Sequence, residues 1–183
     1  MIPPKINISC IVNAHVGTLG GSFWAKVLDF GVFLIIPGLA AGAVVFFCID
    51  VDDDTYGYAL TVFSIFSALL ITVQIAIYGI YSKQCDHIAF LNAKIEGDKS
   101  VADSILVGRY EKRAEKFALL NANISYLTLL SCVCASTFLL FVAFSLPSSV
   151  EQFASVFLYI HFAFTLAMVL KRFHIIFEGE YSK

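Results

Sequence analysis

Long stretches without a charged residue alternate with short charged segments along this chain. Four of the stretches are long enough to cross a membrane as a helix, which takes about 20 mostly apolar residues. They cover residues 30–49, 56–82, 117–150 and 152–170. Strands of a membrane barrel would be about 10 residues long and would alternate in polarity, whereas these stretches are longer and do not alternate. The pattern therefore predicts an all-α integral membrane protein with four transmembrane helices.

The positions of the basic residues predict which side of the membrane each segment faces. Lys and Arg accumulate in cytoplasmic loops. All 12 basic residues lie before the first stretch, between the second and third, or after the fourth. The two short loops at 50–55 and 145–151 carry only acidic charge. We therefore expect both termini and the central segment to be cytoplasmic, in the inner (plasma) membrane of a bacterium.

The central segment is itself helical in character and joins two hairpins. The apolar face of the second span continues past Ser82 as far as Gly97, which offers a helix stop. Ser100 followed by Asp103 resembles a capping box and leads into the third span. Spans two and three should therefore extend into a cytoplasmic helical hairpin. The expected units are a cytoplasmic or interfacial segment 1–26, a transmembrane hairpin 27–82, the cytoplasmic hairpin 83–116, a second transmembrane hairpin 117–173 and a cytoplasmic tail 174–183.

Composition agrees with a membrane protein and offers no catalytic chemistry. Hydrophobic residues make up 59% of the chain and charged residues 14%, against about 25% charged in soluble domains. The sequence contains no phosphate-binding loop, no nucleophile–base arrangement and no metal-spaced Cys/His cluster. We therefore expect no enzyme, no cofactor and no metal site.

Four cations near the start of the third span share one helical face. Their spacings of three, four and seven residues place them together, with a tyrosine beside them. They are Arg109, Lys112, Arg113 and Lys116, with Tyr110. One interpretation is a membrane anchor in contact with anionic lipid. The other is a binding site for a nucleotide or oligonucleotide, on which Tyr110 would stack.

A polar seam follows one face of the third span. Its small polar side chains favour interhelical contacts in lipid, but several copies around an axis would line a water-filled path. The seam comprises Asn121, Ser125, Thr128, Cys132 and Ser136. Gln74 in the second span, and His161 with Thr165 in the fourth, would extend either version.

His161 is the one residue deep in a predicted span that charges readily near neutral pH. Ionisable groups within a membrane are candidates for function. The alternative is a neutral imidazole bonded to a neighbouring hydroxyl. In the first span, Pro37, Gly38 and Gly42 predict a kink in the helix and a face for close helix packing.

Acidic residues gather in the first outer loop, at Asp50, Asp52, Asp53 and Asp54. They lack the spacing of a calcium-binding loop, and the simplest interpretation is a solvated turn. In a symmetric oligomer, repeated copies would instead form a negative vestibule that concentrates cations.

The layout resembles the SLATT-type membrane effectors of prokaryotic defence systems. The likeness rests on residues 24–26 before the first span, the tight turn 50–55 and the helical segment 83–116. It carries over no functional residue. It implies a homo-oligomeric channel or pore-forming effector, gated by a cytoplasmic nucleotide or oligonucleotide in a defence pathway. The alternative is a non-conducting membrane binding protein, such as a toxin-immunity protein or a subunit of a larger complex.

Overall fold

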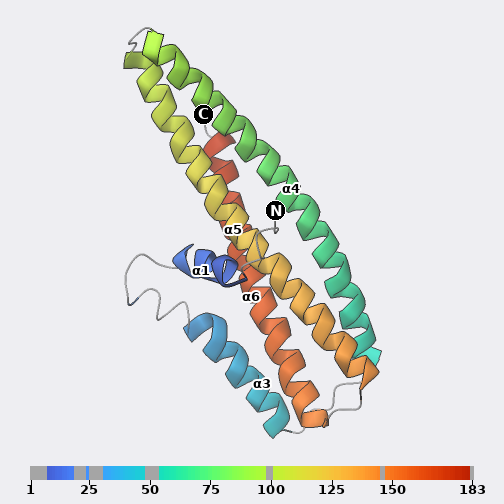
Figure 1. The fold of residues 1–183 in the computed structure, drawn as a ribbon. Coiled ribbons are helices and arrows are strands. Elements are labelled where there is room, and N and C mark those ends of the chain that lie inside the picture. Colours follow the sequence, from blue (N-terminus) through green and yellow to red (C-terminus); the bar gives the residue numbers. More distant parts are fainter. Residues whose placement is uncertain are drawn as a thin grey trace.

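Every element in the described part of the chain is helical (Figure 1). The computed structural model describes residues 8–18, 24, 31–47, 54–97, 101–144 and 147–181. In chain order the elements are α1 (Ile8–Thr18), the π-helical turn η1 (Gly31–Ile35), α3 (Ile36–Phe46), α4 (Asp54–Gly97), α5 (Val101–Ala143) and α6 (Ser148–Tyr181). The predicted all-α class is confirmed for these residues.

Three of the helices are long and apolar enough to cross a membrane. The stretches that qualify are Asp54–Ala93, Ile105–Ala143 and Ser148–Ile176, and they contain the second, third and fourth predicted spans. The first predicted span corresponds to Gly31–Phe46, which is apolar but shorter than the other three. The structure therefore supports a membrane protein, with three helices that are candidates for spanning the membrane.

Helices α4 and α5 are continuous from the apolar region into the charged one. Ser82 lies inside α4, which ends at Gly97 as expected. Helix α5 begins at Val101, directly after Ser100, and includes the whole basic segment before the third span. The two helices lie side by side along their length (Figure 1). The predicted helical continuity of both is thus confirmed.

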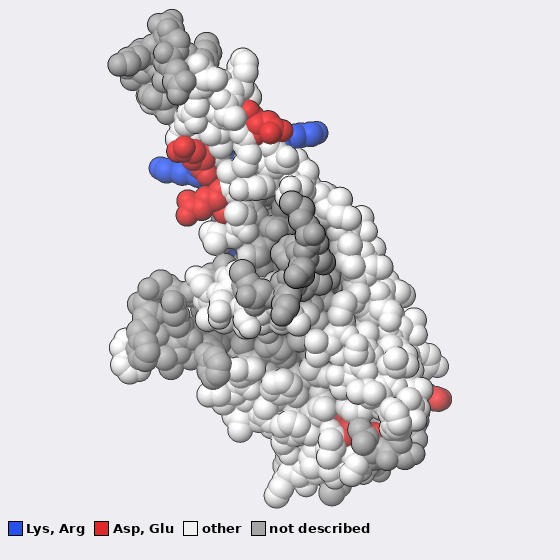
Figure 2. Space-filling view, viewed as in Figure 1, with Lys and Arg blue, Asp and Glu red and all other residues white. Residues whose placement is uncertain are grey.

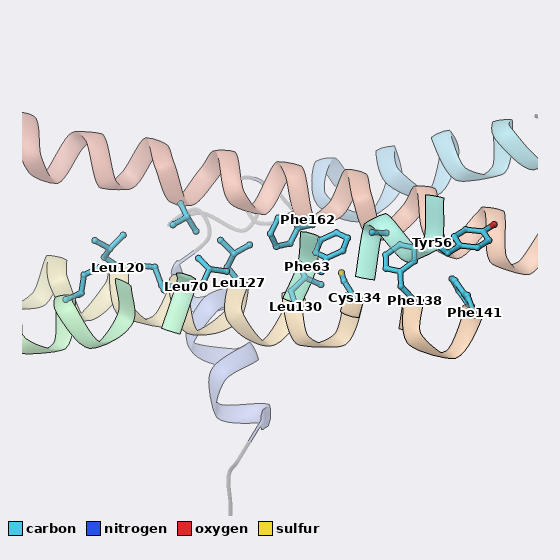
Figure 3. Packing of buried hydrophobic residues seen from close by; sticks show 14 of the residues in the cluster. Tyr56, Phe63, Leu70, Leu120, Leu127, Leu130, Cys134, Phe138, Phe141 and Phe162 are labelled. Atoms are coloured by element: carbon cyan, nitrogen blue, oxygen red, sulfur yellow. The ribbon is translucent and has the colours of Figure 1, made fainter. Parts of the chain in front are cut away.

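Aromatic and aliphatic side chains from α4, α5 and α6 form the core. The Phe63 ring lies 5.6 Å from that of Phe138 on α5 and 4.9 Å from that of Phe162 on α6. Leu120, Leu127 and other α5 side chains continue this core along the helix (Figure 3). Burying such apolar area in lipid adds packing contacts but little solvent-exclusion energy, so close fit and interhelical hydrogen bonds hold the helices together.

Helix α3 packs along α6, and α5 packs between α6 and α4. Helices α3 and α4, expected to form the first hairpin, lie at opposite edges of the array in Figure 1. Pro37 and Ala41 supply the buried face of α3. The packed partner of α3 is therefore α6, a pairing the sequence pattern did not indicate.

Charged side chains of the described residues gather toward one end of the face drawn in Figure 2. On the face shown in Figure 2, basic and acidic side chains gather on the projecting arm, whereas the broad body is almost free of charge. Figure 1 identifies this arm as the end of α4 and the start of α5. This distribution agrees with an apolar body in lipid and an arm in water.

Candidate functional site

Buried polar side chains meet where α1, η1, α5 and α6 come together. His15 on α1 is 6% exposed, Asn123 on α5 is fully buried, and His161 on α6 is 7% exposed. Tyr126 on α5 lies between the two histidines. Buried polar groups in an apolar setting are costly unless they are hydrogen-bonded, and each of these side chains has a partner.

The His161 ring is held by a backbone carbonyl that cannot receive the usual α-helical bond four residues on, because residue 37 is a proline. Within an α-helix, the carbonyl of Phe33 would accept the N–H of residue 37, four positions on. Pro37 has no N–H, and η1 ends just before it. The Phe33 carbonyl instead accepts a hydrogen bond from His161 Nδ1 at 2.7 Å. The region of the kink predicted around Pro37 and the histidine of the fourth predicted span are therefore in contact.

Tyr126 completes the hydrogen bonding of His161. A carbonyl can only accept, so Nδ1 of His161 carries a proton, and in the neutral ring Nε2 is the acceptor. The Tyr126 hydroxyl lies 3.1 Å from Nε2 and donates to it. Both ring nitrogens of His161 are thereby satisfied in the neutral state, as in the structural interpretation of this residue.

Asn123 fixes the orientation of His15 in the same way. Its Nδ2 donates to the Leu119 carbonyl at 2.7 Å, so its Oδ1 faces His15 Nδ1 at 2.9 Å and accepts from it. The His15 ring also stacks on Tyr126, with centroids 4.0 Å apart and planes 2° from parallel. This hydrogen bond and this ring stack thus help to fasten helix α1 to α5.

The surroundings of His15 oppose its protonation. Burial is the largest cause and lowers the pKa of His15 below its ordinary value of 6.5. The hydrogen bond to Asn123 acts in the opposite direction, whereas electrostatic interaction with Arg172 and His161 on α6 lowers the pKa further. Protonation would bring a cation toward Arg172 in a poorly solvated place. We therefore expect acid to weaken the docking of α1 on α5.

The predicted polar seam of α5 faces α4 over part of its length. Ser125 accepts from Gln74 Nε2 at 2.8 Å, and Cys132 lies 3.7 Å from Ser67 Oγ. Thr128 donates to its own helix, and Ser136 is exposed. The buried amide oxygen of Asn121 has no hydrogen-bond partner among the described residues. Of the residues expected to extend the seam, Gln74 reaches it, whereas Thr165 is buried and bonds the His161 carbonyl.

Ser131 makes a further link that the seam did not include. Its hydroxyl donates to the Phe63 carbonyl at 2.9 Å and accepts from Ser67 at 3.1 Å. These bonds join α5 to α4 inside the molecule. The polar contacts between the two helices therefore act as interhelical links in the single chain.

Helix α4 presents a second row of small and hydroxyl side chains, on the side opposite its buried residues. Thr61, Ser64 and Thr72 are exposed, and each donates to the carbonyl four residues earlier at 2.7 to 3.1 Å. A Cβ added at Gly57 or Gly79 would meet nothing within 4 Å. We call this row the α4 outer face; it comprises Gly57, Thr61, Ser64, Ala68, Thr72 and Gly79, and the large, exposed side chain of Ile75 interrupts it between the last two. Helical spacing alone reveals it once the buried face of α4 is known.

The predicted basic stripe divides into two pairs. Arg109 and Arg113 line a small cavity of about 140 Å³ together with Tyr110 and Leu106. Lys112 and Lys116 are exposed and do not line it. A neighbouring cavity of about 310 Å³ includes Tyr110, Lys83 and His87 among its lining residues. The Tyr110 ring lies 4.6 Å from that of His87, edge to face.

The acidic loop that was predicted to face outward lies mostly outside the described residues. This applies to Asp50, Asp52 and Asp53, whereas Asp54 is the exposed first residue of α4. Glu151 and Gln152, in the first turn of α6, are buried. Within the described part of the chain, no group of three or more His, Cys, Asp or Glu side chains is placed to hold a metal ion.

Comparison with known proteins finds no matching family model, no matching curated protein and no matching solved structure.

Proposed function

We propose that the protein is a homo-oligomeric membrane channel or pore-forming effector whose α4 outer face lines or borders the pore. In this arrangement the apolar stretch 30–49 is the first of four spans, both termini are cytoplasmic, and the membrane is the bacterial inner membrane. The charge asymmetry of the loops supports this orientation. The SLATT-like layout of the chain supports an effector role in defence.

The observation that carries the proposal is the direction in which the hydroxyls of α4 point. Thr61, Ser64 and Thr72 face away from the protein's own core. Small side chains allow close approach of a neighbouring helix, and hydroxyls on an exposed face offer water a polar wall. Several copies arranged with α4 inward would have closely packed helices and a polar wall facing the water.

The α5 seam is less suited to line this path. Ser125 and Ser131 are engaged with Gln74, Ser67 and the Phe63 carbonyl within one chain. Opening a path along them would break these bonds. We therefore assign the seam to helix packing and the α4 outer face to the pore.

Cysteine accessibility tests this assignment in the intact membrane. In a background without native cysteines, Ser64→Cys and Thr72→Cys should react with a membrane-impermeant thiol reagent. Val62→Cys and Leu69→Cys are matched controls, because both native side chains are exposed but large and apolar. The controls should react with lipid-soluble reagents only, and Ser131→Cys, at a buried position, should react with neither.

Labelling of Ser64→Cys and Thr72→Cys by lipid-soluble reagents alone would contradict the pore. If the same positions then formed disulfide cross-links to a different protein, the partner-binding alternative would hold. The small, exposed α4 outer face would in that case receive a helix of a larger complex.

The basic cavity at the base of the arm is the proposed input for the signal. Arg109 and Arg113 converge on one space beside Tyr110, an arrangement suited to a phosphate with a stacked base. We propose a nucleotide or oligonucleotide as the trigger.

A further inference from the structure

We propose that the groove between η1 and α6 is a binding site for one anionic phospholipid. The groove has a volume of about 500 Å³, within the range of small-molecule sites. Its walls include Phe33, Phe164 and Met168, and Lys171 and Arg172 lie in the same lining. This site is independent of conduction and of the basic cavity on the arm.

The chemistry of the lining selects an amphiphile. Among the residues that the structure describes, the lining of the groove is apolar except for two adjacent cations, and none of these lining residues is acidic. Its edges are open, since Val32 is 41% exposed and Ile175 is 54% exposed. An acyl chain would cover the apolar walls, and a negatively charged headgroup would meet Lys171, which is exposed.

The position of the cations along α6 favours a lipid over a soluble anion. Lys171 and Arg172 directly follow the uncharged stretch 152–170, so they lie where the hydrocarbon gives way to headgroups. Basic pockets between membrane helices on the cytoplasmic side are suited to anionic headgroups. A soluble anion would gain nothing from the aromatic walls.

Lipid in the groove would also support the buried histidine. The Phe33 ring lines the groove and meets Phe164 edge to face at 6.5 Å. The carbonyl of the same residue accepts from His161. A bound acyl chain would therefore hold η1 in the position that satisfies His161.

Native mass spectrometry of the purified full chain tests the site. The probes are dioleoyl-phosphatidylglycerol and dioleoyl-phosphatidylcholine. Wild type should retain one phosphatidylglycerol per chain in preference to phosphatidylcholine. Lys171→Gln should lower phosphatidylglycerol retention about fivefold, the usual worth of one cation near an anionic headgroup, and leave phosphatidylcholine unchanged. Lys116→Gln is the matched control, with equal charge loss away from the groove, and should behave as wild type.

A second variant tests the apolar part of the groove without changing charge. Ala167 lines the groove and is exposed, so Ala167→Leu should fill it, leave the fold intact and reduce retention of phosphatidylglycerol. Millimolar inorganic phosphate should not displace the lipid. Equal retention of both lipids by wild type, wild-type retention by both groove variants, or displacement by phosphate would each overturn the proposal.

Discussion

His161 lies in an apolar stretch of α6, yet both of its ring nitrogens have hydrogen-bond partners. The sequence identified His161 as an ionisable residue within a predicted span, and Pro37 as the position of a kink in the first predicted span. It could not join them, because the contact links residues 128 positions apart. The sequence shows that residue 37, a proline, cannot donate a backbone hydrogen bond to the Phe33 carbonyl. It does not show that His161 donates to this carbonyl instead, because that contact depends on how α6 packs against η1.

The burial of His15 was not predicted from the sequence. The segment 1–26 was expected to be a simple lead-in, whereas α1 packs against α5 and buries His15 beside Asn123. In a segment of mixed polarity, polar residues are typical of an exposed loop, and only a known buried partner indicates that they are packed. The one available signal was an asparagine within an apolar span, since a buried amide requires partners.

Acid should release α1 from α5. The pKa of His15 is lowered in the docked state, so the undocked state binds more protons between the docked pKa and the ordinary value of 6.5. Docking is therefore fully favoured above that value and weakens as pH falls through the docked pKa. Arg172 and His161 on α6 add to the effect, and Tyr126 on α5 contributes the ring stack.

Hydrogen–deuterium exchange over residues 8–18, corrected for intrinsic rates, measures this release between about pH 8 and about pH 5. Wild type should lose protection as the pH falls. His15→Gln retains a donor for Asn123 but does not titrate, so its protection should be independent of pH. Equal acid sensitivity in both proteins would assign the effect to another group.

Long helices are the feature that the hydrophobic pattern predicted best. Helix α4 has 44 residues and spans about 66 Å at 1.5 Å per residue, about twice the hydrocarbon thickness. The apolar stretch ended at Ser82, but periodic apolar positions beyond it correctly indicated continuation to Gly97. Periodicity gives direction along one helix only, and so it left open which helix each face meets.

The arm offers a charge-matched test of the proposed signal site at the element scale. Arg109→Gln with Arg113→Gln removes the two cations that line the cavity with Tyr110. Lys112→Gln with Lys116→Gln removes equal charge from the same helix face outside it. The arginine pair should abolish most binding of a labelled tetra-adenylate, because converging charge-assisted bonds are lost, whereas the lysine pair should lower affinity only slightly.

Fluorescence anisotropy at low salt measures the affinity of both double variants and of wild type for the labelled tetra-adenylate. Each phosphate contact removed should also flatten the salt dependence of binding by about one unit in the logarithmic slope. Equal losses in the two double variants would indicate a diffuse membrane-anchoring charge. If the wild-type protein did not bind the tetra-adenylate probe, the result would contradict an oligonucleotide trigger.

At the scale of the whole molecule, the order α3, α6, α5, α4 leaves α4 at one edge. The hydrophobic pattern did not order the helices, because it does not indicate which helix each face contacts. The polar seam on α5 favoured either interhelical contacts or a pore, and the structure has interhelical bonds to α4 along it. The edge position of α4 is what exposes Thr61, Ser64 and Thr72.

Single-channel recording of the purified protein in planar bilayers tests the central claim most directly. Wild type should give discrete current steps. In the Ser64→Cys and Thr72→Cys proteins, a charged membrane-impermeant thiol reagent should reduce or abolish those steps, with no effect on Leu69→Cys. Wild-type protein that inserts and oligomerises but passes no current would contradict a channel, and steps unchanged after modification of Ser64→Cys and Thr72→Cys would contradict a pore along α4.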